Sequence, residues 1–318
     1  MKMETAAKAA PREKKPPRTL MTFERRRRLT GYVFLSPWLF GSIFLLFFPL
    51  LFSLILSFTD GQNIQQLKMG FVGIENYKNA FLSDINFLYC LQQVSKETFY
   101  NGPMIIVFSL IIAIMLSRDI KARGFFRSAF FLPVLLGTGY ILEQILGQGV
   151  SEDAMSAVRG IILTPEIAAY LGEDLSQTVS EFLSRITTVM WQSGVQIILF
   201  LAGIQKIPQE IHDAALIDGA SSVKKFWYVT LPMSKESMLV TALITTIGSY
   251  KIFTEIQILT GGGPGRATEV LATAMYRAAF NNDEMGVASA YAVVIFVITL
   301  VLSLIQMKLS RTGEEAEQ

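Results

Sequence analysis

Long apolar segments constrain the fold of this chain more than any other feature of its sequence. A membrane-spanning helix needs roughly 20 largely apolar residues. Six segments meet that condition, at about 31–58, 98–117, 126–146, 186–204, 236–259 and 287–307. Only 17% of the residues are charged, against about 25% in a typical soluble protein. The sequence therefore predicts an all-α polytopic membrane protein with six transmembrane helices.

The positions of Lys and Arg predict the orientation of these helices. If the N-terminus lies inside the cell, 20 Lys and Arg residues fall on the cytoplasmic side and 7 on the outside, which is the asymmetry that membrane proteins show. Both termini are thus expected to be cytoplasmic. We expect residues 1–28 to form a basic tail near anionic lipid, 29–310 the transmembrane domain and 311–318 a second tail. Since lipid explains the basic run, no nucleic acid partner is expected.

Several classes of chemistry are disfavoured by the residues that the chain lacks. It contains a single cysteine, Cys90, and a single histidine, His212. A disulfide framework, a thiolate or histidine metal site and a Ser-His-Asp triad are therefore not expected, and we assign no catalytic or metal-binding residue. The chain also has no G-x-x-x-x-G-K-[ST] stretch to hold the phosphates of a nucleotide.

The loop at residues 205–235, between the fourth and fifth spans, has the pattern of a soluble helical hairpin. Pro208 suits the first turn of a helix, and Glu210 places a negative charge near its positive end. Ile211, Ala214 and Ala215 fall on one face of that helix. The topology predicts that the hairpin lies in the cytoplasm.

The middle of the loop carries the signals for a turn and a second helix. Gly219 favours a left-handed residue that ends the first helix. Ser221 or Ser222 can cap the second helix, which carries Phe226 on an apolar face and which Pro232 is expected to end. One reading is an amphipathic hairpin on the lipid surface. Small residues at the tip instead favour close approach of another protein.

The spacing within this loop resembles a known motif. Asp213, Ala214 and Ala215, then Gly219, then Leu231-Pro232 follow the EAA-x3-G-x9-I-x-LP pattern of binding-protein-dependent ABC importer permeases, with Asp213 at the Glu position and Val229 at the Ile position. The segments "FVGIENYKNAF", "ARGFFRSAFFLP" and "TGGGPGRATE" are similar to the carbohydrate (multi-sugar, maltose or glycerol-3-phosphate) type of this family, nearly end to end.

The resemblance implies a type I ABC importer permease fold in the bacterial inner or plasma membrane. It implies that the hairpin docks on an ATPase subunit and couples ATP hydrolysis to alternating access. The implied partners are two ATPase subunits that bind ATP-Mg, a second homologous permease and an extracellular or periplasmic solute-binding protein. The chain itself would bind no cofactor and would not be an enzyme. The ATPase-coupling residues would be Glu210, Asp213, Ala214, Ala215, Gly219, Phe226, Leu231 and Pro232.

Polar and aromatic residues within the spans are candidates for the substrate path, because polar groups at membrane depth are costly. These candidates are Glu143, Trp191, Gln192, Gln196, Tyr250, Lys251, Phe253 and Glu255. Gln192 and Gln196 either bond a neighbouring helix or contact substrate. Lys251 and Glu255, four residues apart, form an ion pair or line a wet cavity. Snorkelling at the interface also explains Glu143.

The expected cargo is a carbohydrate. Neutral sugars are the default if Lys251 pairs with Glu255, and an anionic oligosaccharide becomes plausible if Lys251 faces the path unpaired. Two alternatives remain open from the sequence. The same machinery carries amino acids, peptides or ions in other members of the family, and a membrane enzyme or scaffold would need no ATPase partner.

Overall fold

The described part of the chain is helical. The computed structural model describes residues 23–61, 70–117, 123–136, 172–259 and 268–315. Within these ranges the structure has no strand, only an isolated antiparallel bridge between Thr59 and Phe71. Four helical segments are long and apolar enough to cross a membrane: Arg27–Leu56, Ile85–Ser117, Lys235–Ile258 and Met285–Ser310. The expectation of a mostly helical chain with apolar helices of spanning length is confirmed.

The chain divides into two compact units, of which the first ends at Phe52. It contains α1 (Phe23–Ser42), a π-helical turn η1 (Ile43–Phe47) and most of α2 (Phe48–Leu56), which run on without a break. Nearly all apolar side chains of these helices are exposed. Such a surface suits a surrounding of lipid, in which apolar side chains need no protein partner.

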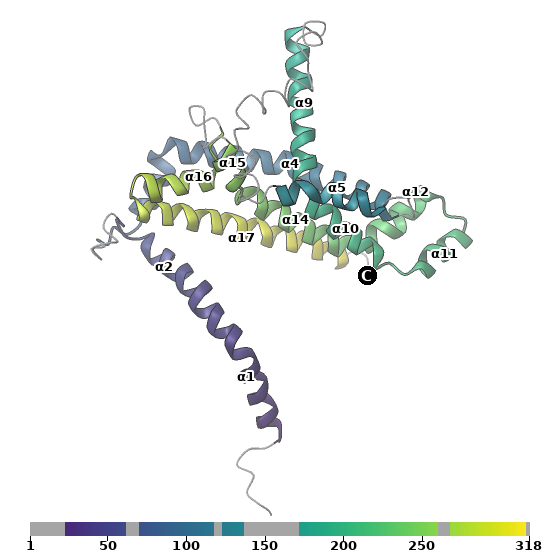
Figure 1. Cartoon of the computed structure of the whole chain (residues 1–318), viewed down its shortest axis with the longest axis horizontal. Coiled ribbons are helices and arrows are strands. Elements are labelled where there is room, and N and C mark those ends of the chain that lie inside the picture. Colours follow the sequence, from purple (N-terminus) through teal and green to yellow (C-terminus); the bar gives the residue numbers. More distant parts are fainter. Residues whose placement is uncertain (1–22, 62–69, 118–122, 137–171, 260–267, 316–318) are drawn as a thin grey trace, which may run out of the picture. The chain divides into compact units, whose positions relative to one another are not determined.

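The second unit runs from Ser53 to the C-terminus and contains the remaining elements. In chain order these are α3 (Glu75–Lys78), η3 (Asn79–Ser83), α4 (Ile85–Ser117), α5 (Arg123–Leu136), α9 (Glu173–Gln192), α10 (Gly194–Gln205), α11 (Gln209–Ile217), α12 (Ser222–Lys225), η4 (Phe226–Thr230), α13 (Leu231–Met233), α14 (Lys235–Tyr250), α15 (Thr254–Leu259), α16 (Leu271–Tyr276), η5 (Arg277–Asn281) and α17 (Met285–Glu315). Helices α4, α10, α14 and α17 form its centre: α4 and α10 pack together, and α14 contacts α4, α10 and α17 (Figure 1).

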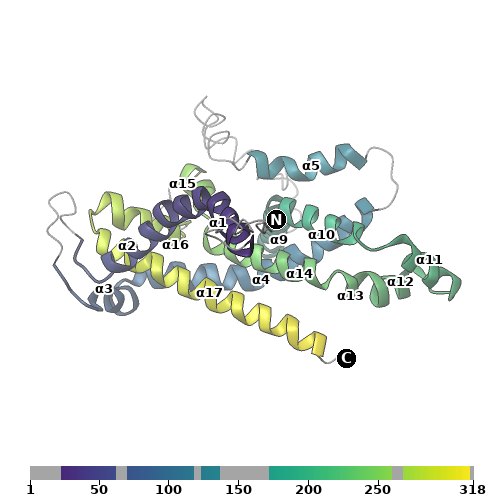
Figure 2. The same ribbon diagram turned by 90° about the horizontal axis from the view of Figure 1, so that it is seen from below.

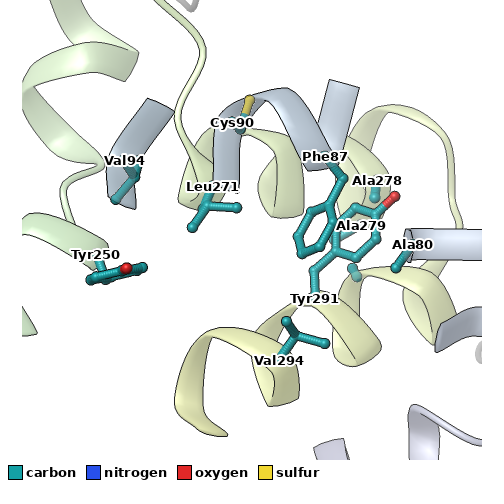
Figure 3. Close-up of a cluster of buried hydrophobic side chains, with 11 residues drawn as sticks. Ala80, Phe87, Cys90, Val94, Tyr250, Leu271, Ala278, Ala279, Tyr291 and Val294 are labelled. Atoms are coloured by element: carbon teal, nitrogen blue, oxygen red, sulfur yellow. The ribbon is translucent and has the colours of Figure 1, made fainter. Parts of the chain in front are cut away.

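One core cluster joins α4, α16, η5 and α17. Its centre is the ring of Phe87, which stacks on the ring of Tyr291 with 4.1 Å between centroids and 19° between planes (Figure 3). Small residues, Ala278 and Ala279 among them, let η5 approach these rings closely. The Tyr291 hydroxyl donates a hydrogen bond to Asp84 Oδ2, so the buried hydroxyl has a polar partner.

A second core cluster joins α4 to α10. Its buried residues are Leu110, Ala113, Leu116, Ile197, Phe200, Leu201 and Ile204. Partly buried side chains from outside these two helices, including Phe226 and Leu231, pack against it. This cluster is the surface to which the helical hairpin is attached.

The observed helices differ from the expected spans in three places. Helix α4 begins at Ile85 and not near 98. The fourth span is divided at Ser193 between α9 and α10, and only Gly194–Gln205 is uniformly apolar. The fifth span is divided after Tyr250, between α14 and α15. The second half of the third span, 137–146, lies outside the described residues.

The second unit carries its hairpin and its α16–η5 segment at opposite ends. Both views place α11 and α12 at one end of the helices and α16 at the other (Figures 1 and 2). Helix α14 leads from the hairpin end toward α15 and α16. A residue after the end of α14 therefore lies away from the hairpin.

Candidate functional site

The first helix of the hairpin, α11, begins directly after Pro208. Pro208 is its N-cap, with φ −59° and ψ 140°, so the proline precedes the first turn and does not lie within it as predicted. Glu210 lies in the first turn, where a negative charge is favourable. The expected apolar face is formed only in part: Ala215 is buried and Ile211 is half-buried, whereas Ala214 is exposed.

Gly219 closes α11 through a Schellman motif. Its φ is +73°, the left-handed conformation that the sequence predicted. The Ala220 N–H donates to the Ala215 carbonyl at 2.9 Å, and the Gly219 N–H donates to the Leu216 carbonyl at 3.0 Å. These two bonds satisfy carbonyls that the end of a helix otherwise leaves without partners. The turn between the two helices is therefore held by backbone hydrogen bonds.

The second helix of the hairpin begins at a serine cap and runs past Pro232. The Ser221 side chain accepts a hydrogen bond from the Lys224 N–H at 3.3 Å, which confirms a serine cap at this point. The prediction that Pro232 ends the helix is wrong, because α12, η4 and α13 follow one another without interruption to Met233. Pro232 is the last residue but one of this helical run, and its missing N–H removes one hydrogen bond from the last turn.

Two apolar side chains attach the hairpin to the rest of the unit. Phe226 and Leu231 are half-buried and pack against the cluster between α4 and α10. Thr230 is buried between them, and its carbonyl accepts a hydrogen bond from the Ser234 hydroxyl at 2.7 Å. Phe226 and Leu231 thus hold the base of the hairpin, not its tip.

The tip of the hairpin is exposed and is both apolar and charged. Ile217 is 87% exposed, and Leu216, Val223 and Trp227 are also exposed. Asp213 lies on the exposed surface of α11 and accepts a hydrogen bond from Gln209 Nε2 at 3.0 Å. An exposed apolar patch beside a carboxylate is typical of a surface that another protein covers.

The path candidates in the fourth span are separated by the break at Ser193. Gln196 is buried in α10, and its Nε2 lies 3.2 Å from Thr245 Oγ1 of α14. This contact favours bonding between helices over contact with substrate for Gln196. Gln192 is half-buried and Trp191 is exposed, both in the last turn of α9. Glu143 lies outside the described residues.

The path candidates in the fifth span occupy the break between α14 and α15. Tyr250 is buried in the first core cluster, and its hydroxyl lies 2.9 Å from Ser95 Oγ, so its ring has no free face for a sugar (Figure 3). Lys251 is exposed, and Glu255 is half-buried in α15. Because α14 ends at Tyr250 and Lys251 lies in the break after it, the two are not one turn apart on one helix. Within the described ranges no ion pair joins Lys251 to a carboxylate, and Phe253 is half-buried.

A buried ion pair was not predicted from the sequence. Arg277 Nη1 of η5 lies 2.6 Å from Glu269 Oε1, and the Glu269 side chain is only 2% exposed. The Glu269 carbonyl also accepts a hydrogen bond from the Cys90 thiol of α4 at 3.4 Å. Eight positions separate the two charges in sequence, which is not a helical i, i+4 spacing, so no local pattern indicated the pair.

These elements define a membrane protein of a known class. Residues 97–312 match the family described as "Binding-protein-dependent transport system inner membrane component". The match covers more than half of the chain, and the chain belongs to this family. It is therefore an inner-membrane permease subunit of an ABC importer.

Similar proteins support this assignment over most of the chain. It is 36% identical over 304 residues to the probable ABC transporter permease protein YurN of Bacillus subtilis, which covers 91% of this chain and 99% of that protein. It is 32% identical to the multiple sugar-binding transport system permease protein MsmF of Streptococcus mutans, over 89% of this chain and 96% of that protein.

A solved structure has the same fold at low sequence identity. It is the crystal structure of a bacterial ABC transporter involved in the import of the acidic polysaccharide alginate. The chain aligns with it at a TM-score of 0.59 and 18% identity, covering 91% of this chain and 97% of that chain. The family match and the similar proteins confirm the resemblance to ABC importer permeases that the 205–235 loop indicated, and this structure shows the same fold.

Proposed function

We propose that this permease carries oligosaccharides or other sugars inward by alternating access, and that the hairpin at 208–232 couples it to an ATPase. The observation that supports the coupling role is the hairpin itself: its tip is exposed, while Phe226 and Leu231 attach its base to the α4–α10 cluster. A partner bound at the tip would therefore act on the centre of the second unit. The partners proposed are two ATPase subunits binding ATP-Mg, a second homologous permease and a solute-binding protein.

The proposal also includes the number of transmembrane helices and their orientation in the membrane. Six transmembrane helices with both termini in the cytoplasm would place the hairpin on the ATPase side and the α16–η5 segment on the side of the binding protein. The opposite placement of these two segments in the second unit supports this arrangement (Figure 2). The chain would bind no cofactor and would carry no ATPase site. Residues 1–28 and 311–318 would be its cytoplasmic tails.

Carbohydrate is the favoured cargo because several relatives of the chain are named as permeases of sugar transport systems. Besides MsmF, the arabinooligosaccharides transport system permease protein AraP of Bacillus subtilis is 30% identical over 89% of this chain. Permeases for amino acids, peptides or ions are the alternative. A membrane enzyme or scaffold without an ATPase partner does not agree with the family.

An acidic oligosaccharide is a second candidate cargo, supported by Lys251. This side chain is exposed at the break between α14 and α15, and in the described part of the chain it has no carboxylate partner. A cation in such a position would attract a uronate carboxylate. The neutral alternative keeps Lys251 in contact with water.

The experiment that tests the function is uptake by the complete importer in proteoliposomes. We would offer trisaccharides of the α-glucan, arabinan and mannuronate series, with ATP inside and the binding protein outside. Asp213→Arg should remove sugar-stimulated ATP hydrolysis while the chain stays inserted. Glu236→Arg, another acidic residue that is exposed but lies outside the hairpin, is the matched control. Normal stimulated hydrolysis in Asp213→Arg would contradict the coupling role.

Lys251→Met separates the two cargo candidates. It should slow uptake of the mannuronate trisaccharide about tenfold, the effect of losing one charge-assisted contact of roughly 1.5 kcal/mol, and should leave a neutral trisaccharide unaffected. Equal uptake of both series by Lys251→Met would exclude a role of this cation in recognising the cargo.

A further inference from the structure

Three aromatic rings form a continuous row on the segments that follow α14. Phe253 lies 5.4 Å from Tyr276, and Tyr276 lies 4.8 Å from Phe280, measured between ring centroids. The planes of neighbouring rings are tilted by 42° and 39°. We call Phe253, Tyr276 and Phe280 the aromatic strip.

The backbone departs from a regular α-helix at two of the three residues of the strip. Phe253 lies in the extended break between α14 and α15. Tyr276 ends α16, and Phe280 follows four positions later within the π-helical turn η5, so that both rings lie on one side of the segment.

The buried ion pair fixes the same segment in place. Arg277, directly after Tyr276, is joined to the buried Glu269, and Ala278 and Ala279 pack into the first core cluster. The opposite side of η5 is therefore held by a charge pair and by small buried residues. The strip remains on the side that this packing leaves open.

Exposure increases along the strip, from half-buried Phe253 to Tyr276 at 38% and Phe280 at 62%. Polar groups continue beyond its open end: Asn281, Asn282 and Asp283 directly follow Phe280, and all three are exposed. At its other end, the exposed Lys251 lies two positions from Phe253. Flat rings flanked by amide, carboxylate and ammonium groups suit a ligand that has both apolar C–H faces and many hydroxyls.

We propose that the aromatic strip binds an oligosaccharide by stacking successive sugar rings, from Phe280 at the outer end of the unit to Phe253 at the break beside Lys251. The proposal rests on the proposed carbohydrate function. Centroid spacings of 4.8 and 5.4 Å are close to the length of one sugar ring, so three successive sugar rings contact the whole strip and a shorter saccharide contacts only part of it. The strip thus selects for chain length.

Alternatively, the aromatic strip lies against the lipid at the membrane interface, where aromatic residues gather in belts. The two interpretations predict different results when an aromatic residue of the strip is substituted. An interface accepts Leu in place of Phe, whereas stacking on a sugar requires an aromatic ring. The polar residues 281–283 beside Phe280 favour the sugar.

The test compares uptake of two chain lengths by the complete importer in proteoliposomes, each supplied on its binding protein. The probes are the disaccharide, which is too short to cover all three rings, and the trisaccharide of the series that the wild-type importer carries. Phe280→Leu should lower the ratio of trisaccharide to disaccharide uptake about five- to tenfold, while Phe280→Tyr should keep the ratio within about twofold of wild type. Phe296→Leu, at an exposed phenylalanine of α17, is the matched control and should leave the ratio unchanged.

Every other result contradicts the proposal that the aromatic strip binds sugar, and each result points to a different reason. If Phe280→Leu and Phe280→Tyr both leave the ratio unchanged, the strip does not bind sugar, although carbohydrate import stands. If both lower the uptake of the two probes equally and reduce the amount of assembled complex, the ring is structural or belongs to the interface. If the wild-type importer carries no saccharide of any series, the proposed function fails and the strip fails with it.

Discussion

Single residues decide the geometry of the hairpin at 208–232 more than its helices do. Gly219 adopts φ +73°, and an added Cβ there would meet nothing within 4 Å. The requirement for glycine is thus one of backbone conformation and not of space. The sequence predicted this position correctly, because the need for a left-handed residue after a helix is local and leaves a local signature.

Gly219→Ala should strain the turn by about 1–2 kcal/mol, the cost of placing an L-residue in the left-handed helical region. We expect less ATPase to co-purify with this variant than with wild type. Gly219→Asn should retain more ATPase than Gly219→Ala, because Asn tolerates the left-handed region. Gly172→Ala is the matched control, since Gly172 also has a positive φ of 77° and open space around it but precedes α9. Equal co-purification by Gly219→Ala and wild type would show that the turn is not needed for docking.

Gln196→Met should change stability slightly and uptake hardly at all. The substitution removes the bond between α10 and α14, worth about 0.6 kcal/mol within a membrane, while the Thr245 hydroxyl keeps its bond to the Thr241 carbonyl at 2.8 Å. The readouts are the unfolding temperature of the purified complex and the KM for sugar. A severalfold rise in KM at unchanged unfolding temperature would show that Gln196 contacts substrate after all.

At the scale of elements, the lengths of the apolar segments were predictable and their interruptions were not. Hydropathy measures how apolar a segment is, so it found the first, second, fifth and sixth spans. It does not detect the break at Ser193, where the serine hydroxyl bonds back to the Val189 carbonyl and competes with the regular helical pattern. Nor does it detect the end of α14, where the Lys251 N–H is shared between the carbonyls of Ile247 and Gly248.

The distance between α10 and α14 where they cross is also set at the scale of elements. It depends on Gly203, which has no side chain. A Cβ at Gly203 would lie 1.9 Å from Ser237 Oγ and 2.7 Å from Ser237 Cβ. The two helices therefore approach more closely than any larger residue allows, as is common between membrane helices.

Gly203→Ala should separate α10 from α14 and destabilise the unit by about 1–3 kcal/mol, the usual cost of overpacking. Ser237→Gly removes the atoms that the new methyl group would meet. The double variant Gly203→Ala with Ser237→Gly should therefore recover most of the lost thermal stability, measured on the purified complex. If the double variant is no more stable than Gly203→Ala alone, the close approach at this pair does not set the distance between the helices.

At the scale of the whole molecule, the family was predictable because it depends on a local motif, whereas the placement of the path residues was not. Tyr250, chosen as a stacking surface, is buried and bonded to Ser95. Tyr276 and Phe280 were not chosen, although they form the more exposed rings. Which side of a helix is covered depends on neighbours that are distant in sequence, and no spacing within one segment encodes them.

The proposed orientation has a direct test that uses the single cysteine. Cys90 is 1% exposed, so the native thiol should react slowly with a membrane-impermeant reagent. In a Cys90→Ala background, Val223→Cys in the hairpin should be labelled only in inside-out vesicles, and Asn282→Cys after η5 only in right-side-out vesicles. Both native residues are exposed. Labelling of both positions from the same side would reject the predicted topology.

The way in which the hairpin is attached determines how it transmits force. Phe226 and Leu231 fix its second helix to the α4–α10 cluster, and the Schellman bonds at Gly219 stiffen the turn beyond them. A load applied at the exposed tip therefore acts with the full length of the hairpin as its moment arm. If the hairpin couples the permease to an ATPase as proposed, a turn that resists bending would transmit this load as a torque to the interface between α4 and α10.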